Sequence, residues 1–214
     1  MLKVRDLQLF HNQPQLINFD VNYGDIFQIR GGPGSGKTKI FKILSGVLRP
    51  LHGDVFFDGD SLYNSDFYKL ALSRKKLGVI FEDPNILSNL SLRQNIEFIL
   101  RSRFKEWSGE TDEIVEKFQL SRFLEQRKMT MSRDAIKRFN FLKVVLCEGK
   151  LLVFDELNLS ELSSVNNYFL DYLFDPSDKK SVVFTGDIPK EIYGSITRSF
   201  DLSSGNRLEL KNAA

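Results

Sequence analysis

The stretch "GGPGSGKT", residues 31–38, constrains the fold of this chain more than any other part of its sequence. It follows "DIFQIRG" (25–31), which predicts a strand, and precedes "KTKIFKILSGVL" (37–48), which predicts a helix. The apolar residues at helical spacing in that helix are Ile40, Phe41, Leu44, Val47 and Leu48. A strand, a glycine-rich loop and a helix in this order predict a loop whose backbone N–H groups surround phosphate oxygens at the start of the helix.

The residue types in this loop suit a bound nucleotide. They fit the pattern G-x-x-x-x-G-K-[S/T], and the strand before it and the helix after it argue against a plain glycine turn. Lys37 is expected to reach the β- and γ-phosphates, and the hydroxyl of Thr38 is expected to bind Mg²⁺. The expected nucleotide-binding residues of the loop are Gly31, Gly32, Pro33, Gly34, Ser35, Gly36, Lys37, Thr38 and Lys39.

A loop of this kind needs a carboxylate for the metal at the end of a nearby buried strand. "LLVFDE" supplies four apolar residues followed by Asp155 and Glu156. We expect Asp155 to hold Mg²⁺ through water and Glu156 to polarise the attacking water as the general base. The alternative is an ordinary strand that ends in two solvated acids.

Strand and helix patterns alternate at both ends of the chain, with an all-helical stretch between them. Predicted strands cover 2–10, 15–21, 25–31, 54–59, 76–83, 150–156 and 180–187, and predicted helices include 37–48, 91–104 and about 161–174. "SLRQ" (91–94) is a capping-box pattern, and the tail predicts a hairpin that turns at 204–206. This order predicts an α/β fold: a mainly parallel sheet, an antiparallel N-terminal β layer and an inserted helical subdomain.

Composition limits the possible partners and surroundings. The formal net charge of +2 gives no electrostatic support for nucleic-acid binding. A single cysteine, Cys147, rules out an internal disulfide and suits a reducing compartment. No apolar run approaches the ~18 residues that a membrane span needs, and the first ten residues are too charged for a signal peptide. A role at a membrane would therefore need a separate subunit.

With these motifs, the chain resembles the ATP-binding subunit of ABC transporters from end to end. The resemblance rests on "GGPGSGKTKIFKILSGVLRPLHGDVFFDG", on "LGVIFEDPNILSNLSLRQNI" and on "GKLLVFDEL". It implies a single P-loop NTPase domain, 1–214, with a core at about 1–84 and 149–214 and a helical subdomain at about 85–148. It also implies ATP and Mg²⁺ as cofactors, a second cassette and a permease-type membrane subunit as partners, and a cytoplasmic position on the inner face of the membrane. The short length suits stand-alone bacterial cassettes.

Four elements depart from the family pattern. The signature, usually Leu-Ser-Gly-Gly-Gln, falls on Met131, Ser132, Arg133, Asp134 and Ala135. The Q-loop glutamine falls on Glu82, whose oxygen can still face Mg²⁺, and the switch histidine falls on Gly186. The proline and threonine that follow the catalytic glutamate fall on Leu157 and Asn158.

These departures are expected to weaken some contacts with the nucleotide phosphates more than others. Ser132 keeps the signature hydroxyl, but Asp134 is expected to place a carboxylate where triphosphate oxygens approach. Arg133 either offsets that charge or faces solvent. Gly186 offers no side chain to the γ-phosphate, and a loss of this kind costs on the order of 10²-fold in rate.

Several aromatic residues have two possible roles. Phe10 or His11 falls where the family places an adenine-stacking ring, and Phe10 is favoured. Phe98, Phe104 and Trp107 are candidate docking contacts for a membrane partner, although core packing is favoured for them.

The predicted function is a Mg-ATP-binding subunit with weak or partner-dependent ATPase activity. The alternatives are a nucleotide-gated scaffold without turnover and a soluble kinase or GTPase, which fits the glycine-rich loop alone.

Overall fold

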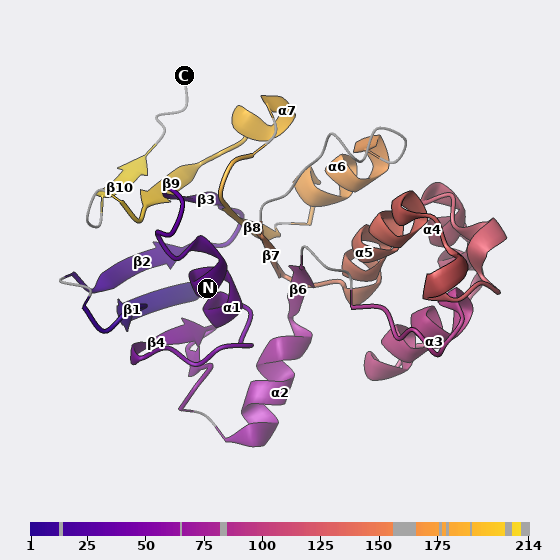
Figure 1. Ribbon diagram of the computed structural model, residues 1–214, viewed down its shortest axis with the longest axis horizontal. Helices are drawn as coiled ribbons and strands as arrows, with labels where there is room; N and C mark the ends of the chain where they lie inside the picture. The colour runs from indigo at the N-terminus through magenta and orange to yellow at the C-terminus, as the bar shows by residue number, and fades with distance from the viewer. Residues whose placement is uncertain are drawn as a thin grey trace.

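A six-stranded sheet with the order β10-β9-β3-β8-β7-β6 runs through the centre of the computed structural model (Figure 1). Its strands are β3 (Ile26–Arg30), β6 (Leu77–Ile80), β7 (Leu151–Asp155), β8 (Ser181–Thr185), β9 (Arg198–Asp201) and β10 (Arg207–Leu210). The β10/β9 pair is antiparallel and the other pairs are parallel. The structure describes residues 1–12, 15–64, 66–81, 85–155, 166–175, 177–178, 180–188, 190–203 and 207–210.

A second sheet, with the order β2-β1-β4-β5, is antiparallel throughout. It consists of β1 (Leu2–Gln8), β2 (Ile17–Val21), β4 (His52–Phe57) and β5 (Asp60–Ser61). Buried and exposed residues alternate along β2, as expected for a sheet with one face on the core. The antiparallel N-terminal layer predicted from sequence is therefore confirmed.

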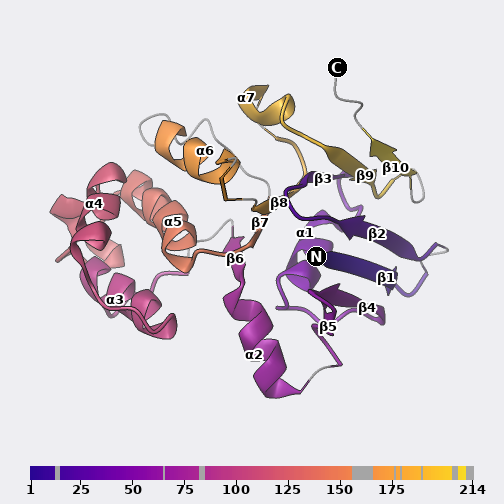
Figure 2. The same ribbon diagram turned by 180° about the vertical axis from the view of Figure 1, so that it is seen from behind.

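The helices are α1 (Lys37–Leu44), α2 (Phe67–Lys75), α3 (Leu92–Ser102), α4 (Gly109–Lys117), α5 (Arg133–Cys147), α6 (Asn166–Phe174) and α7 (Lys190–Tyr193). Two short 3₁₀ turns, Ser121–Phe123 and Lys128–Thr130, lie between α4 and α5. Both views show α3, α4 and α5 gathered at one end of the molecule and the antiparallel sheet at the other (Figures 1 and 2). The predicted α/β fold with a helical insert is confirmed.

Two hydrophobic cores lie on opposite faces of the parallel sheet. Leu152 and Phe154 of β7 face the core that includes α3, α5 and α6, whereas Leu151 and Val153 face the core that includes α1 and the antiparallel sheet. Every residue of β7 and β8 is buried for this reason. A strand buried on both faces needs a continuous apolar run rather than an alternating one, and "LLVF" supplies it.

Several element boundaries differ from the sequence predictions. The helix predicted over 37–48 ends at Leu44, because Gly46 takes φ +71 and closes the helix, and Val47 is 61% exposed. Helix α2 was not predicted. Asp66 caps it by accepting a hydrogen bond from the Lys69 N–H (2.8 Å), but its sequence has no apolar stripe that would reveal a helix.

Other local predictions are confirmed. Ser91 and Gln94 form the expected capping box at the start of α3. The tail pairs β9 with β10 as predicted, while its turn at 204–206 lies outside the described residues. None of the helices in the described part of the chain is both long and apolar enough to cross a membrane.

The capping box gives a stability prediction. Ser91 is 9% exposed, its hydroxyl accepts from the Gln94 N–H, and the Gln94 side chain accepts from the Ser91 N–H (2.9 Å). We expect Ser91→Ala to lower the free energy of unfolding by about 1 kcal/mol, because it leaves a helix N–H without its partner. Urea denaturation measures this change. Ser91→Thr keeps the hydroxyl and is the control; an equal loss in both variants would show that packing, not capping, is responsible.

Candidate functional site

The glycine-rich loop connects the carboxyl end of β3 to the first turn of α1. Gly34 has φ +77 and Gly36 has φ +99, a left-handed conformation that side chains disfavour. A Cβ at Gly36 would also lie 2.9 Å from Leu9 Cδ1 and 3.0 Å from the Phe10 ring. Gly36 is therefore required both by its backbone conformation and by the close approach of the segment that follows β1.

Lys37 lies across this loop. Its Nζ donates to the carbonyl oxygen of Gly31 (2.8 Å) and approaches that of Gly32 (3.3 Å). No described side chain caps the N-terminus of α1, whose first turn carries Lys37, Thr38 and Lys39 and no acid. A helix N-terminus without a side-chain cap and a lysine ammonium at one place suit an anion with several oxygens, as a polyphosphate has.

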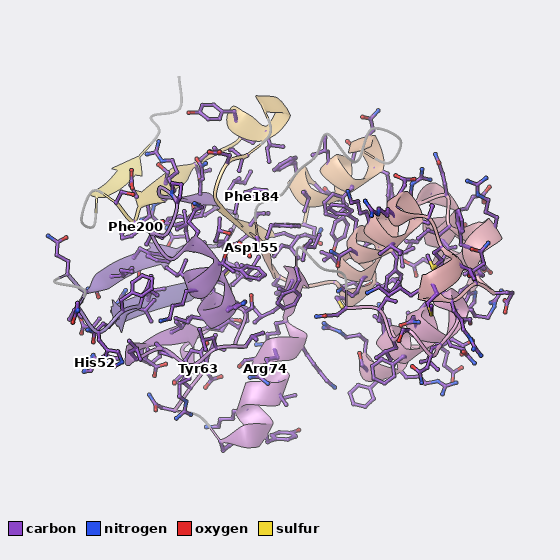
Figure 3. The ribbon with its side chains drawn as sticks, viewed as in Figure 1. His52, Tyr63, Arg74, Asp155, Phe184 and Phe200 are labelled. Atoms are coloured by element: carbon purple, nitrogen blue, oxygen red, sulfur yellow. The ribbon has the colours of Figure 1, made fainter. Side chains whose placement is uncertain are left out.

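The predicted metal ligand Asp155 lies at the carboxyl end of β7 and is 8% exposed. Strand β8 lies between β7 and β3, so the start of the glycine-rich loop is about two strand spacings away, or ~10 Å. Figure 3 shows Asp155 near the middle of the molecule. Thr38 is exposed in the first turn of α1. A hydroxyl and one carboxylate fit Mg²⁺, which takes few protein ligands and completes its octahedron with water and phosphate oxygens.

Two residues that the sequence analysis did not single out complete this edge of the sheet. The Thr185 hydroxyl donates to Asp155 Oδ1 (2.7 Å). Gln28, which is 5% exposed on β3, donates from Nε2 to the carbonyl oxygen of Gly186 (2.9 Å). A glutamine within the otherwise apolar run "IFQI" was the available signal for Gln28, because a buried amide needs a partner.

Gly186, the position of the expected switch residue, has a fixed backbone. It has φ +84, its N–H donates to the Ile29 carbonyl (2.8 Å), and its own carbonyl accepts from Gln28. This glycine therefore adopts a conformation that an L side chain would strain.

Phe10 lies beside the loop and is 42% exposed. Its ring approaches Gly36, and the Lys39 ammonium lies 4.7 Å from its centroid. A pocket of about 320 Å³ opens here, lined by Leu9, Phe10, Asn12, Ile17, Gly34, Ser35 and Leu202. His11 is exposed and is not among these lining residues.

The segment on which the signature is expected to fall lies at the start of α5. Ser132 caps the helix by accepting from the Ala135 N–H (3.2 Å). Asp134 forms an ion pair with Arg138 one turn later, and Arg138 also donates to Gln119 Oε1 (2.7 Å). Arg133 was expected either to offset the charge of Asp134 or to face solvent, and it is exposed. Arg138 pairs with Asp134, because residues four apart share a helix face.

Some predicted positions fall outside the described residues: Glu82, Glu156, Leu157 and Asn158. The residue before Glu82 is held in place, since Asn140 of α5 donates to the Phe81 carbonyl (2.9 Å). The Phe81 ring meets Phe41 of α1 edge-on at 5.2 Å. The chain that leads to the expected Q-loop position is therefore in contact with both α1 and α5.

The three aromatic residues of the helical insert differ in their surroundings. Phe98 is 60% exposed and Phe104 is 88% exposed, so the core packing favoured for them from sequence is wrong. Trp107 is partly buried, donates to Asp112 Oδ1 (2.8 Å) and stacks with Arg93 at 4.6 Å. Phe104 has φ +58 just after the end of α3, where glycine is usual, and the Lys75 ammonium lies 4.0 Å from its ring.

The sequence is similar to ATP-binding proteins of transporters. The methionine import ATP-binding protein MetN of Halalkalibacterium halodurans is 28% identical over 166 residues, which are 76% of this chain and 49% of that protein. The energy-coupling factor transporter ATP-binding protein EcfA1 of Mesomycoplasma hyopneumoniae is 29% identical over 167 residues, 73% of this chain and 60% of that protein. The chain thus spans less than two thirds of the length of these curated relatives.

The fold is that of solved ATP-binding cassettes. A dimeric structure of the cassette MJ0796, bound to ADP and Pi, has a TM-score of 0.79 and 20% identity, and the match covers 98% of both chains. The cassette cbiO1 from Clostridium perfringens has a TM-score of 0.71 and 21% identity, covering 98% of this chain and 86% of that one. The model of the ABC transporter family matches residues 15–158. This match extends over more than half of the sequence and includes the glycine-rich loop and Asp155, and it shows that the chain belongs to the ABC transporter family.

Proposed function

We propose that this chain binds Mg-ATP at its glycine-rich loop and couples nucleotide binding, or slow hydrolysis, to a membrane partner. The observation that carries this proposal is that the glycine-rich loop with Lys37 and the carboxylate of Asp155 lie at the same edge of the sheet, where β3 and β7 end. A cation inside a loop of backbone N–H groups fits the phosphates. A nearly buried carboxylate two strands away fits the metal that a nucleoside triphosphate carries.

Each residue of the proposed nucleotide site has a distinct role. The Lys37 ammonium binds the β- and γ-phosphates, and the Thr38 hydroxyl and Asp155 hold Mg²⁺, directly and through water. The metal neutralises phosphate charge when it is bound. Glu82 is proposed as a further metal contact and Glu156 as the general base that accepts a proton from the attacking water. Phe10, half exposed beside a pocket next to the loop, is the proposed adenine contact.

The proposed assembly pairs this chain with a second cassette. One nucleotide would lie between the glycine-rich loop here and the partner's signature, and the other between the partner's loop and the start of α5. The ion pair between Asp134 and Arg138 supports a smaller repulsion at the second site than Asp134 alone would cause. The missing side chain at Gly186 favours slow turnover at the first site.

A membrane subunit of the permease type is the proposed second partner. Exposed rings of Phe98 and Phe104 support a docking surface beside α3, together with Tyr68 and Leu72 on α2, which are 72% and 44% exposed. Phe104 keeps an unfavourable backbone conformation and a nearly fully exposed ring, a combination more typical of binding than of stability. We propose that residues about 85–148 act as the helical subdomain that carries most of this surface, on the inner face of the membrane.

A nucleotide-gated scaffold with negligible turnover is the second candidate. The observation that favours it is the backbone of Gly186, which Gln28 and Ile29 hold in a turn without a side chain that could contact the γ-phosphate. Both candidates bind Mg-ATP and differ in whether the nucleotide is hydrolysed.

Removal of the loop lysine tests nucleotide binding. We expect Lys37→Ala to weaken Mg-ATP affinity by about 10-fold or more, because a charge-assisted contact to phosphate contributes about 1.5–3 kcal/mol. Isothermal titration calorimetry measures the affinity. Lys42→Ala removes an exposed lysine from the last turn of α1 and is the matched control. Equal affinity in Lys37→Ala and the unaltered chain would contradict the proposed loop function.

The rate of hydrolysis separates the two candidates. We expect the purified chain alone to hydrolyse ATP more slowly than about 1 s⁻¹, the low end for typical enzymes. Glu156→Gln should abolish the residual rate while leaving Mg-ATP binding intact, because only the base is lost. Steady-state phosphate release provides the measurement. A residual rate that is unchanged in Glu156→Gln would support the scaffold.

Restoring a histidine at the switch position is expected to fail. Gly186 has φ +84, so Gly186→His would force an L residue into a left-handed conformation that costs about 1–2 kcal/mol. We expect this variant to lower the melting temperature and leave the ATPase rate no higher. Thermal unfolding and phosphate release test this expectation, with Gly186→Ala as the control for backbone strain. A faster, equally stable Gly186→His variant would show that only the ring was missing.

A further inference from the structure

Thr185 and Asp155 form a buried pair across neighbouring strands. They are register partners at the carboxyl ends of β8 and β7. Thr185 is fully buried and Asp155 is 8% exposed, and Thr185 Oγ1 lies 2.7 Å from Asp155 Oδ1. At this separation the hydroxyl donates a charge-assisted hydrogen bond to the carboxylate.

The hydroxyl has a single proton, and the geometry indicates where it goes. Thr185 Oγ1 also lies 3.3 Å from the Phe154 carbonyl, but the contact to Asp155 is the shorter one. One donor can satisfy only one of the two acceptors fully, and an ionised carboxylate is the stronger acceptor. This bond occupies one acceptor position on Oδ1 of Asp155 and restricts rotation of the carboxylate. The remaining acceptor positions of the carboxylate are left for a metal or its bound water.

The end of β8 is itself fixed relative to the glycine-rich loop. The residue after Thr185, Gly186, accepts from the Gln28 side chain and donates to the Ile29 carbonyl. Both partners lie on β3, the strand that leads into the loop. Thr185 therefore connects the carboxylate on β7 to a strand end that is held against β3.

We propose that Thr185 is a positioning residue for the metal site: its hydroxyl fixes the orientation in which the Asp155 carboxylate meets the Mg²⁺ of the bound nucleotide. This inference rests on the proposed Mg-ATP function and adds a residue that holds the metal's carboxylate without touching the metal. Hydrogen-bond partners of metal-binding carboxylates typically change metal affinity by 10–100-fold when they are removed.

The test compares two substitutions of Thr185. Thr185→Val keeps the shape of the side chain and removes the donor, whereas Thr185→Ser keeps the donor. Calorimetry measures the ATP affinity of each variant with saturating Mg²⁺ and with EDTA. A titration with Mg²⁺ then gives the Mg²⁺ concentration at which half of the difference between these two affinities is reached. We expect Thr185→Val to raise that Mg²⁺ concentration about 10-fold, with ATP affinity in EDTA unchanged. Thr185→Ser should stay within about twofold of the unaltered chain.

The other outcomes separate this inference from the proposed function. If Thr185→Val weakens ATP binding equally with Mg²⁺ and with EDTA, or changes neither, Thr185 has no role toward the metal and the inference is overturned. If the unaltered chain binds no Mg-ATP, the proposed function fails and the inference fails with it. Circular dichroism checks that each variant is folded. If Thr185→Val does not fold, Thr185→Cys takes its place, because cysteine is similar in size and only a weak donor. Thr185→Cys should then also raise the Mg²⁺ concentration needed for half of the gain in ATP affinity.

Discussion

Strands β3, β8 and β7 lie side by side and parallel in the central sheet, and this arrangement brings the glycine-rich loop, Gly186 and Asp155 to one edge. The carboxyl ends of parallel strands meet at one edge. The glycine-rich loop leaves β3, Thr185 and Gly186 end β8, and Asp155 ends β7. Hydrophobic burial on both faces holds these strands in register, so the loop and the carboxylate come to one place although more than a hundred residues separate them.

Hydrogen bonds then orient the groups that burial has brought together. Thr185 donates to Asp155, and Gln28 donates to Gly186, in both cases between adjacent strands. The Asp134–Arg138 ion pair has a comparable effect at the start of α5, where it balances the charge of Asp134. At all three places the chain itself provides the hydrogen-bond or ion-pair partner.

Elements with strong local patterns could be predicted from the sequence, whereas elements with weak patterns could not. "LLVFD" and "SVVFT" are continuous apolar runs, and both are strands buried on two faces. Helix α2 was missed because the apolar residues of "FYKLALSRK" do not form a stripe. The first helix was predicted one turn too long, because Leu48 and Val47 fit the helical period while Gly46 ended the helix. The exposure of Phe98 and Phe104 could not be predicted, since periodicity gives the face of a helix but not whether another element covers it.

The sequence by itself determined the family, the α/β fold with its helical insert and the place of the glycine-rich loop, because glycine spacing and apolar periodicity are local properties of a chain. The tertiary structure decided which side chains from distant segments become partners. It paired Thr185 with Asp155, Gln28 with Gly186, and Arg138 rather than Arg133 with Asp134. Such pairs depend on strand register, helix phase and burial, which arise only when the cores on both faces of the sheet have formed.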